Sequence, residues 1–168
     1  MHLPRLRSLT FLFLLFAIHY RLTAEEACPR PEIGSSVAEP SDFYSKNGVL
    51  KVDLEYRGSV NNGQNRYCFV AKDSSQAPTL HVKPGDQLIL TLKNTLPAST
   101  DTHTMKMAGH ASCTNNMMTS ASANLHFHGL VIAPVCHQDD TLNTFVQPSD
   151  PPYEYRFTIP KDQPPGAE

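Results

Sequence analysis

The pattern of hydrophobic and polar positions in this chain predicts strands and no helices. Over residues 49–56, apolar and charged side chains alternate, which is the period of a strand with one buried face. Asn47-Gly48 before this segment and Asn61-Asn62-Gly63 after it are typical turn sequences. The other apolar segments are short, bounded by Gly and Pro, and lack helical periodicity. These further expected strands are 66–71, 79–83, 87–93, 124–132 and 153–159, with Pro84-Gly85-Asp86 as a tight turn.

Short strands separated by turns, in a chain with 14 prolines, predict an all-β fold. The arrangement we expect is an antiparallel β-sandwich with Greek-key connections. Residues 28–45 are rich in Pro, Ser and Glu and show no apolar periodicity. We therefore expect residues 25–45 to form a loose leader and residues 46–168 to form the folded domain.

The first 24 residues are typical of a secretory signal peptide. Arg5 and Arg7 precede the apolar run 9–18, and Ala24 offers a small residue at a cleavage point before Glu25. This pattern predicts a secreted or periplasmic protein. The run is too short to span a bilayer, and no later segment is longer, so we expect no membrane span.

The charge of the exported part argues against nucleic acid as a partner. Of the 14 basic residues, three arginines lie in the expected signal peptide, whereas all 16 acidic residues lie beyond it. The exported part is therefore net acidic, and a nucleic-acid surface would be basic.

All four cysteines, Cys28, Cys68, Cys113 and Cys136, lie in the exported part. An even count in an exported chain predicts two disulfides, and the sequence leaves three connectivities open. A thiolate copper site is not expected, because Cys136-His137 has no methionine or histidine downstream.

The sequence Asn124-Leu125-His126-Phe127-His128-Gly129 carries the clearest candidate chemistry. On a strand, residues two apart share one face, so His126 and His128 would point the same way, about 6.7 Å apart at the backbone. Neutral imidazole binds copper, zinc, iron or nickel. The pair is therefore a candidate for half of a metal site, and a surface or hydrogen-bonded pair is the alternative.

Three segments together resemble the first domain of a multicopper oxidase of the laccase-like family. The first, over residues 77–96, contains Pro-Thr-Leu, Pro-Gly-Asp and Asn-x-Leu, the second is His126-Phe127-His128-Gly129, and the third is the Tyr-x-Tyr-x-Phe strand at 153–157. Their order and approximate spacing match that family over residues 49–168. The resemblance implies a cupredoxin (plastocyanin-like) fold and copper as the cofactor.

The resemblance also implies roles for individual residues. His126 resembles a ligand of the type 2 copper and His128 a ligand of one type 3 copper, in a trinuclear cluster that reduces O₂ with electrons from an organic or metal-ion substrate. Asp139 or Asp140 falls near an acid thought to assist proton delivery in that family. For either aspartate, closing a turn after Cys136-His137-Gln138 is the alternative role.

The sequence departs from the family at several points. Phe127 stands where tryptophan is frequent, and the type 1 copper site and three of the four His-x-His motifs are missing. Because the sequence stops at Glu168, before the second His-x-His motif, we expect a sandwich incomplete at its C-terminus. Such a domain would need the remaining domains of an oxidase and would be inactive alone. A stand-alone secreted copper carrier and a metal-free secreted interaction module are the alternatives.

A long insert over residues 97–123 is rich in Ser and Thr. It could be a Cu(I)-binding loop, because thioether and imidazole ligands favour that ion. The interpretation that we favour is a solvated loop held by a Cys113 disulfide, with methionines packed on the sheet. The candidate ligands in it are Met105, Met107, Met117, Met118, His103 and His110.

Overall fold

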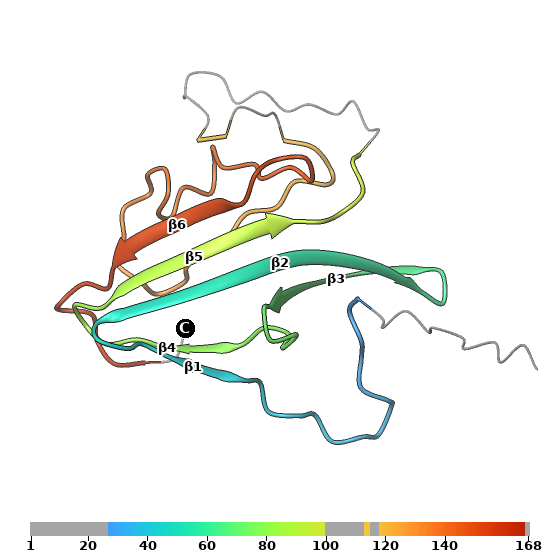
Figure 1. Ribbon diagram of the computed structural model, residues 1–168, viewed down its shortest axis with the longest axis horizontal. Coiled ribbons are helices and arrows are strands. Elements are labelled where there is room, and N and C mark those ends of the chain that lie inside the picture. Colours follow the sequence, from blue (N-terminus) through green and yellow to red (C-terminus); the bar gives the residue numbers. More distant parts are fainter. Residues whose placement is uncertain (1–26, 100–112, 115–117, 167–168) are drawn as a thin grey trace, which may run out of the picture.

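The computed structural model describes residues 27–99, 113–114 and 118–166, which contain six strands and no helix. The prediction of an all-β fold is therefore confirmed. The expected signal peptide lies outside the described residues. The strands are β1 (Asp42–Tyr44), β2 (Val49–Asn61), β3 (Gln64–Ala71), β4 (Thr79–His81), β5 (Gln87–Asn94) and β6 (Tyr153–Thr158) (Figure 1).

The main sheet has four strands in the order β3-β2-β5-β6, and β1 pairs with β4 in a separate two-stranded sheet (Figure 1). β2 pairs antiparallel with β3, and β5 pairs antiparallel with β6. The pairs β2-β5 and β1-β4 are parallel, whereas the sequence analysis predicted antiparallel pairing alone. The difference arises because β3 and β4 lie between β2 and β5 in the chain, so that β5 returns beside β2 in the same direction.

Two Asn-Gly sequences form the turns that were predicted for them. Asn62 and Gly63 have φ angles of 50° and 75° and join β2 to β3, where Asn61 pairs with Gln64. Asn47 and Gly48 have φ angles of 53° and 78° and lead into β2. Positive φ at both central residues is the geometry that Asn-Gly adopts most readily, which explains the position of both turns.

The predicted turn at Pro84-Gly85-Asp86 is also present, and the Asp86 side chain stabilises it. Gly85 has a φ angle of 91°, and the Asp86 amide donates to the Lys83 carbonyl oxygen over 2.9 Å. The Asp86 carboxylate accepts hydrogen bonds from the Lys83 amide at 2.9 Å and from the Ser45 hydroxyl. The turn before β5 is thereby fixed to the segment before β2.

These contacts predict an acid-dependent loss of stability. The Ser45 hydroxyl, and next the Lys83 amide, hold the pKa of the Asp86 carboxyl below its ordinary value. The stabilisation from this carboxylate is therefore present above its unfolded-state pKa, and it is lost as the pH falls through the folded-state pKa. Asp86→Asn should lower the melting temperature at pH 7, and the difference from wild type should shrink below about pH 4.

Thermal melts of both proteins from pH 7 to pH 3 test this expectation. Asp53→Asn, on the exposed side of β2, is the control and should show no such dependence on pH. A gap between wild type and Asp86→Asn that stays constant down to pH 3 would contradict the role given to the Asp86 carboxylate.

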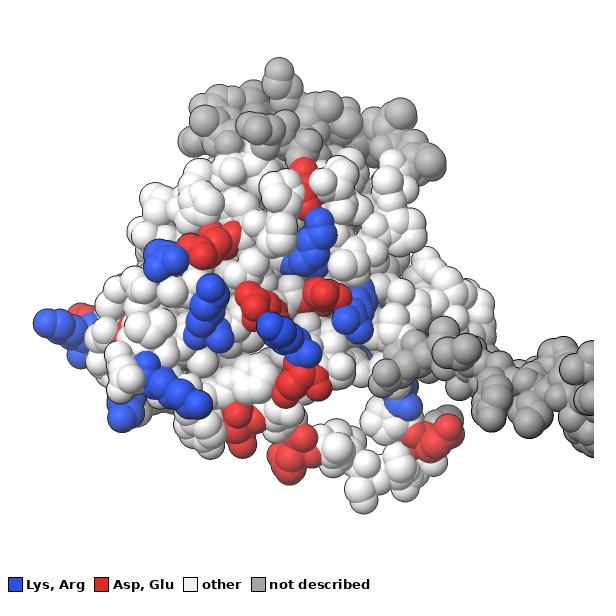
Figure 2. Space-filling view, in the orientation of Figure 1, with Lys and Arg blue, Asp and Glu red and all other residues white. Residues whose placement is uncertain are grey.

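The hydrophobic core lies against one face of the main sheet. β5 is its centre, with Leu90 2% exposed and Leu92 fully buried. The opposite face is polar and carries exposed ion pairs between Arg57 and Glu55 and between Arg156 and Glu154. Figure 2 shows side chains of both charges interspersed, without a large region of one sign. The other core residues of the sheet are Leu50, Val52, Leu54, Ala71, Leu88, Tyr153, Tyr155 and Phe157.

The core is closed by the small β1-β4 sheet and by irregular segments around residues 121–123, at the end of the insert, and around residue 146. Phe43 and Leu80 pack against the core from the small sheet. Ala121, Ala123 and Val146 are buried core residues of the irregular segments, and Ala123 and Val146 form an isolated bridge. One layer of this fold is thus built largely without regular strands.

The strand predicted over residues 124–132 was wrong, although its apolar residues do face the core. Leu125 and Phe127 pack against the core as the alternating pattern suggested. Their amides, however, donate to the side chains of Tyr155 and Asp139 and not to a neighbouring strand. Gly129, with a φ angle of 69°, then turns the chain. Alternating burial without a ladder of backbone hydrogen bonds explains why the pattern was misleading.

The expected leader is attached to the domain at both ends of its described part. Cys28 is 1% exposed and forms a disulfide with Cys68. β1, which the sequence did not predict, pairs with β4. A three-residue strand is too short to give a hydrophobic period, and a disulfide partner leaves no local signal in the sequence.

Both predicted disulfides are present, and no cysteine is free. The connectivity is Cys28–Cys68 and Cys113–Cys136. The second disulfide joins the insert to the chain just before Asp139 and Asp140. None of the described residues belongs to a helix long and apolar enough to cross a membrane.

Candidate metal site

His126 and His128 lie side by side on the surface. Their ring centroids are 4.6 Å apart, with the ring planes at 65°. Both side chains are exposed, and they belong to the irregular segment between Ala123 and the turn at Gly129. The proximity predicted from strand spacing is therefore present, although no strand produces it.

Asp139 lies against His126. One carboxylate oxygen, Oδ1, is 2.8 Å from the His126 Nδ1 atom and accepts a hydrogen bond of 3.0 Å from the Phe127 amide. The Asp139 side chain is 14% exposed, and that of His126 is 49% exposed. An Nδ1–H that donates to this carboxylate leaves the His126 Nε2 lone pair directed away from the aspartate and able to bind a metal ion.

Asp140 faces a different part of the structure. It is 8% exposed, and its Oδ1 atom accepts hydrogen bonds from the amides of Leu142 and Asn143 at 3.1 and 3.0 Å. Its Oδ2 atom lies 3.2 Å from the Cys113 sulfur. Of the two aspartates considered as a proton relay, Asp139 is the one that contacts a candidate ligand, and Asp140 closes a turn.

Asn124 and Tyr155 also belong to this site, although neither was predicted to take part in it. The Tyr155 hydroxyl donates to Asn124 Oδ1 at 2.6 Å and accepts from the Leu125 amide at 3.1 Å. Asn124 Nδ2 in turn donates to the Asp140 carbonyl oxygen at 3.1 Å. Burial raises the pKa of Tyr155, so its hydroxyl stays protonated and remains a donor at neutral pH. The alternating pattern of β6 indicated that Tyr155 is buried, but not which groups its hydroxyl binds.

Two further contacts hold the segment that carries the histidines. The Phe127 ring packs edge-on against Phe157, with centroids 4.8 Å apart. The Gln163 side chain donates to the Gly129 carbonyl oxygen at 3.0 Å and accepts from the Val131 amide at 3.2 Å. Side chains of β6 and of the segment after it thus replace the strand pairing that was expected here.

The residues present fit part of a copper or zinc site. The two imidazoles supply two ligands, whereas a tightly held ion needs three or four. The Asp139 carboxylate is hydrogen-bonded to the His126 ring, so it orients a ligand and is not counted as one. Among the described residues, three potential ligand atoms lie within 4.8 Å of one another only at Cys113, Cys136 and Asp140, where both sulfurs are in the disulfide.

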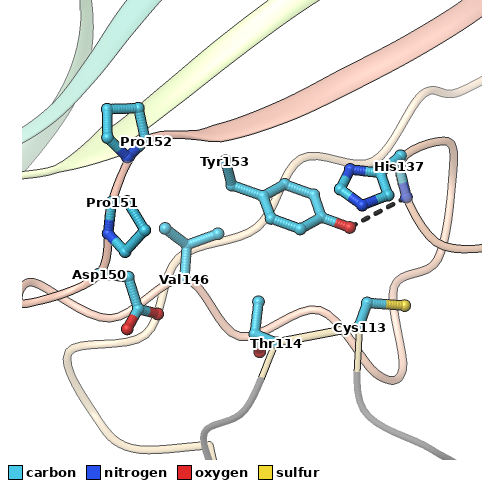
Figure 3. A pocket seen from close by; sticks show the side chains of 8 residues that line it. All are labelled: Cys113, Thr114, His137, Val146, Asp150, Pro151, Pro152 and Tyr153. Carbon is cyan, nitrogen blue, oxygen red and sulfur yellow. Dashed lines mark hydrogen bonds between the residues drawn. The ribbon is translucent and has the colours of Figure 1, made fainter.

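The other histidines described by the structure have different partners. His81 lies 2.7 Å from the Asp42 carboxylate and stacks on Tyr44, with centroids 4.3 Å apart. His137 stacks on Tyr153 at 4.7 Å, and its amide donates to the Tyr153 hydroxyl at 2.9 Å (Figure 3). Among the described residues, the ring contacts of these two histidines are with tyrosines and not with another histidine.

A cavity of about 240 Å³ lies beside the His137–Tyr153 stack. Figure 3 shows His137, Tyr153 and Cys113 around it, with Pro151 and Pro152 at another side. Of the methionines considered as Cu(I) ligands, Met105, Met107 and Met117 lie outside the described residues, and Met118 is 43% exposed.

Comparisons with known proteins show a distant structural likeness and no match in sequence. No family model matches the sequence, and no curated protein matches it. Among solved structures, the chain is similar to a multicopper oxidase from Campylobacter jejuni, described as a metallo-oxidase, with a TM-score of 0.42 and 18% identity. The match covers 74% of this chain and 22% of that one, so the chain spans less than a quarter of that oxidase.

Proposed function

We propose that this chain is an exported copper-binding β-sandwich domain in which His126 and His128 bind the ion. The observation that carries the proposal is the contact of 2.8 Å between the Asp139 carboxylate and the His126 Nδ1 atom, with the His128 ring beside it. A carboxylate on the far nitrogen fixes the ring orientation and makes the imidazole a better ligand.

The sequence resemblance to a multicopper oxidase supports a more specific role. In this proposal, the domain contributes His126 and His128 to a trinuclear copper cluster whose other ligands come from domains outside this chain. Copper bound there would supply the reduction of O₂, coupled to one-electron oxidation of an organic or metal-ion substrate. Asp139 would hold the proton on His126 Nδ1, and its partly exposed carboxylate is the candidate proton relay.

Isothermal titration with Cu(II) tests the proposed ligands. Because two imidazoles alone make an incomplete site, we expect weak, mononuclear binding by the wild type. His126→Ala/His128→Ala should abolish the binding, and Asp139→Asn should weaken it by about tenfold or more. Far-UV circular dichroism should show that the variants remain folded, since both rings are on the surface.

His81→Ala/His137→Ala is the matched control, because it also removes two exposed histidines of the described region. It should bind Cu(II) as the wild type does. Undiminished binding by the His126/His128 double variant would overturn the assignment. A wild type that binds no Cu(II) would favour the metal-free interaction module.

A further inference from the structure

Asp140 points a buried carboxylate oxygen at the Cys113–Cys136 disulfide. Its Oδ2 atom is 3.2 Å from the Cys113 sulfur, and the residue is 8% exposed. In the oxidised protein this oxygen accepts a hydrogen bond from Asn143 Nδ2 at 3.0 Å, and the Cys113 sulfur that it also faces carries no hydrogen to donate. A Cys113 thiol would donate to it without any movement of the aspartate.

The other disulfide has different surroundings. The sulfurs of Cys28 and Cys68 face backbone carbonyl oxygens of Arg57 and Ala27, at 3.5 and 3.2 Å, and Cys28 is 1% exposed. Cys136, in contrast, is exposed, so a reductant can reach the second disulfide directly. Only the second disulfide therefore combines access with a carboxylate, among the residues that the structure describes.

We propose that the reduced Cys113–Cys136 pair and Asp140 form a second metal site, for an ion that prefers thiolates, such as Zn²⁺. One atom from each of the three residues already lies within 4.8 Å of the others. The two Cα atoms are 5.3 Å apart, so rotation of the side chains can bring both sulfurs to about 2.3 Å from one ion. Two thiolates and one carboxylate are a ligand set that zinc accepts.

A water molecule would take the fourth coordination position, because Cys136 is exposed to solvent. Cys113 lines the cavity of about 240 Å³ beside His137, which has room for a water molecule (Figure 3). Three protein ligands and one water make an open site, in which the ion can exchange ligands. The positive ion would also offset the repulsion between the Asp140 carboxylate and the thiolates.

The disulfide is reduced in two steps, and the metal ion binds afterwards. A small dithiol attacks the exposed Cys136 sulfur as its thiolate, the S–S bond breaks, and Cys113 leaves and takes up a proton. The second thiol of the reductant then displaces Cys136, so the protein gains two electrons and two protons and the reductant becomes a cyclic disulfide. Binding of the metal ion releases both thiol protons.

The test uses Co²⁺ as a spectroscopic probe for Zn²⁺. All variants carry His126→Ala/His128→Ala, which removes the proposed copper ligands and makes the test independent of the proposed function. After reduction with a dithiol and its anaerobic removal, the protein with all four cysteines should bind Co²⁺ and show thiolate-to-cobalt charge-transfer absorption. Zn²⁺ should displace the cobalt, and reoxidation should abolish the absorption.

Matched pairs of variants decide whether the site is the one proposed. Cys113→Ser/Cys136→Ser should lose the absorption, and Cys28→Ser/Cys68→Ser should keep it. Adding Asp140→Asn to the latter variant should weaken Co²⁺ binding by about tenfold or more. If the Cys28/Cys68 variant does not fold, Asp140→Asn is compared in the protein with all four cysteines.

Two results would overturn the proposal. One is equal Co²⁺ binding by the reduced protein with and without Cys113 and Cys136. The other is unchanged affinity in Asp140→Asn, which would mean that the carboxylate is no ligand.

Discussion

Replacing Asn94 with leucine is expected to lower the free energy of unfolding by roughly 2–5 kcal/mol. Asn94 is fully buried at the end of β5. Its side-chain Nδ2 donates to the carbonyl oxygens of Ala121 and Val146, at 2.7 and 2.8 Å. Leucine fills a similar volume but leaves the Ala121 carbonyl oxygen without this donor and the Val146 carbonyl oxygen with the Ala123 amide alone. The Leu96 amide also loses its bond to Asn94 Oδ1. An unmatched buried group costs about 1–3 kcal/mol and a lost hydrogen bond about 0.5–1.5 kcal/mol.

Urea unfolding of the two proteins measures the difference. Asn65→Leu, at an exposed position of β3, is the matched control and should change the free energy of unfolding by less than about 0.5 kcal/mol. A loss of less than 1 kcal/mol in Asn94→Leu would show that the bond between β5 and the irregular layer contributes little to stability.

Asn94 shows how far the sequence could predict this fold. The strand predicted over residues 87–93 is present as β5, which ends at Asn94. β2 and β6 were predictable because each buries alternate side chains over six residues, and β5 because it is a short apolar segment that follows a turn sequence. The hydrogen bonds of the Asn94 side chain could not be predicted. Their acceptors lie 27 and 52 positions away in the sequence and share no pattern with Asn94.

The prediction failed where side chains take over the role of strand pairing. At residues 124–132 the apolar spacing of a strand is present, but the amides of Leu125 and Phe127 bind Tyr155 and Asp139. Sequence periodicity reports which side chains are buried and carries no information on where the backbone hydrogen bonds go. The parallel pairing of β2 with β5 was missed for a related reason, since register between distant strands is not a local property.

The two proposed ligands could be predicted from the sequence, but the side chains that hold them in place could not. His126 and His128 stand two residues apart, and any extended backbone brings such residues close. Asp139 was a candidate together with Asp140, and only the turn at residues 137–140, with His137 at a φ angle of 66°, directs Asp139 toward His126. The position of Tyr155 in the sequence predicted that its ring is buried. It did not indicate that the hydroxyl binds Asn124 and the Leu125 amide next to the histidines.

Tyr155 and Tyr153 offer a matched pair for testing that role. Both lie on the buried face of β6, at 1% and 9% exposure. The Tyr155 hydroxyl binds Asn124 and the Leu125 amide, next to the histidines. The Tyr153 hydroxyl binds the His137 amide. Tyr155→Phe and Tyr153→Phe each remove the hydrogen bonding of a buried tyrosine. Only Tyr155→Phe loosens the segment that carries His126 and His128.

We expect Tyr155→Phe to lower the free energy of unfolding by about 1–3 kcal/mol and to weaken Cu(II) binding severalfold, although both imidazoles remain. Tyr153→Phe should cost a similar free energy of unfolding and leave the Cu(II) affinity as it is in the wild type. Urea unfolding and isothermal titration of the three proteins measure both quantities. Equal loss of Cu(II) affinity in the two variants would mean that binding follows overall stability. Unchanged affinity in Tyr155→Phe would mean that Asp139 alone is enough to hold His126 in place.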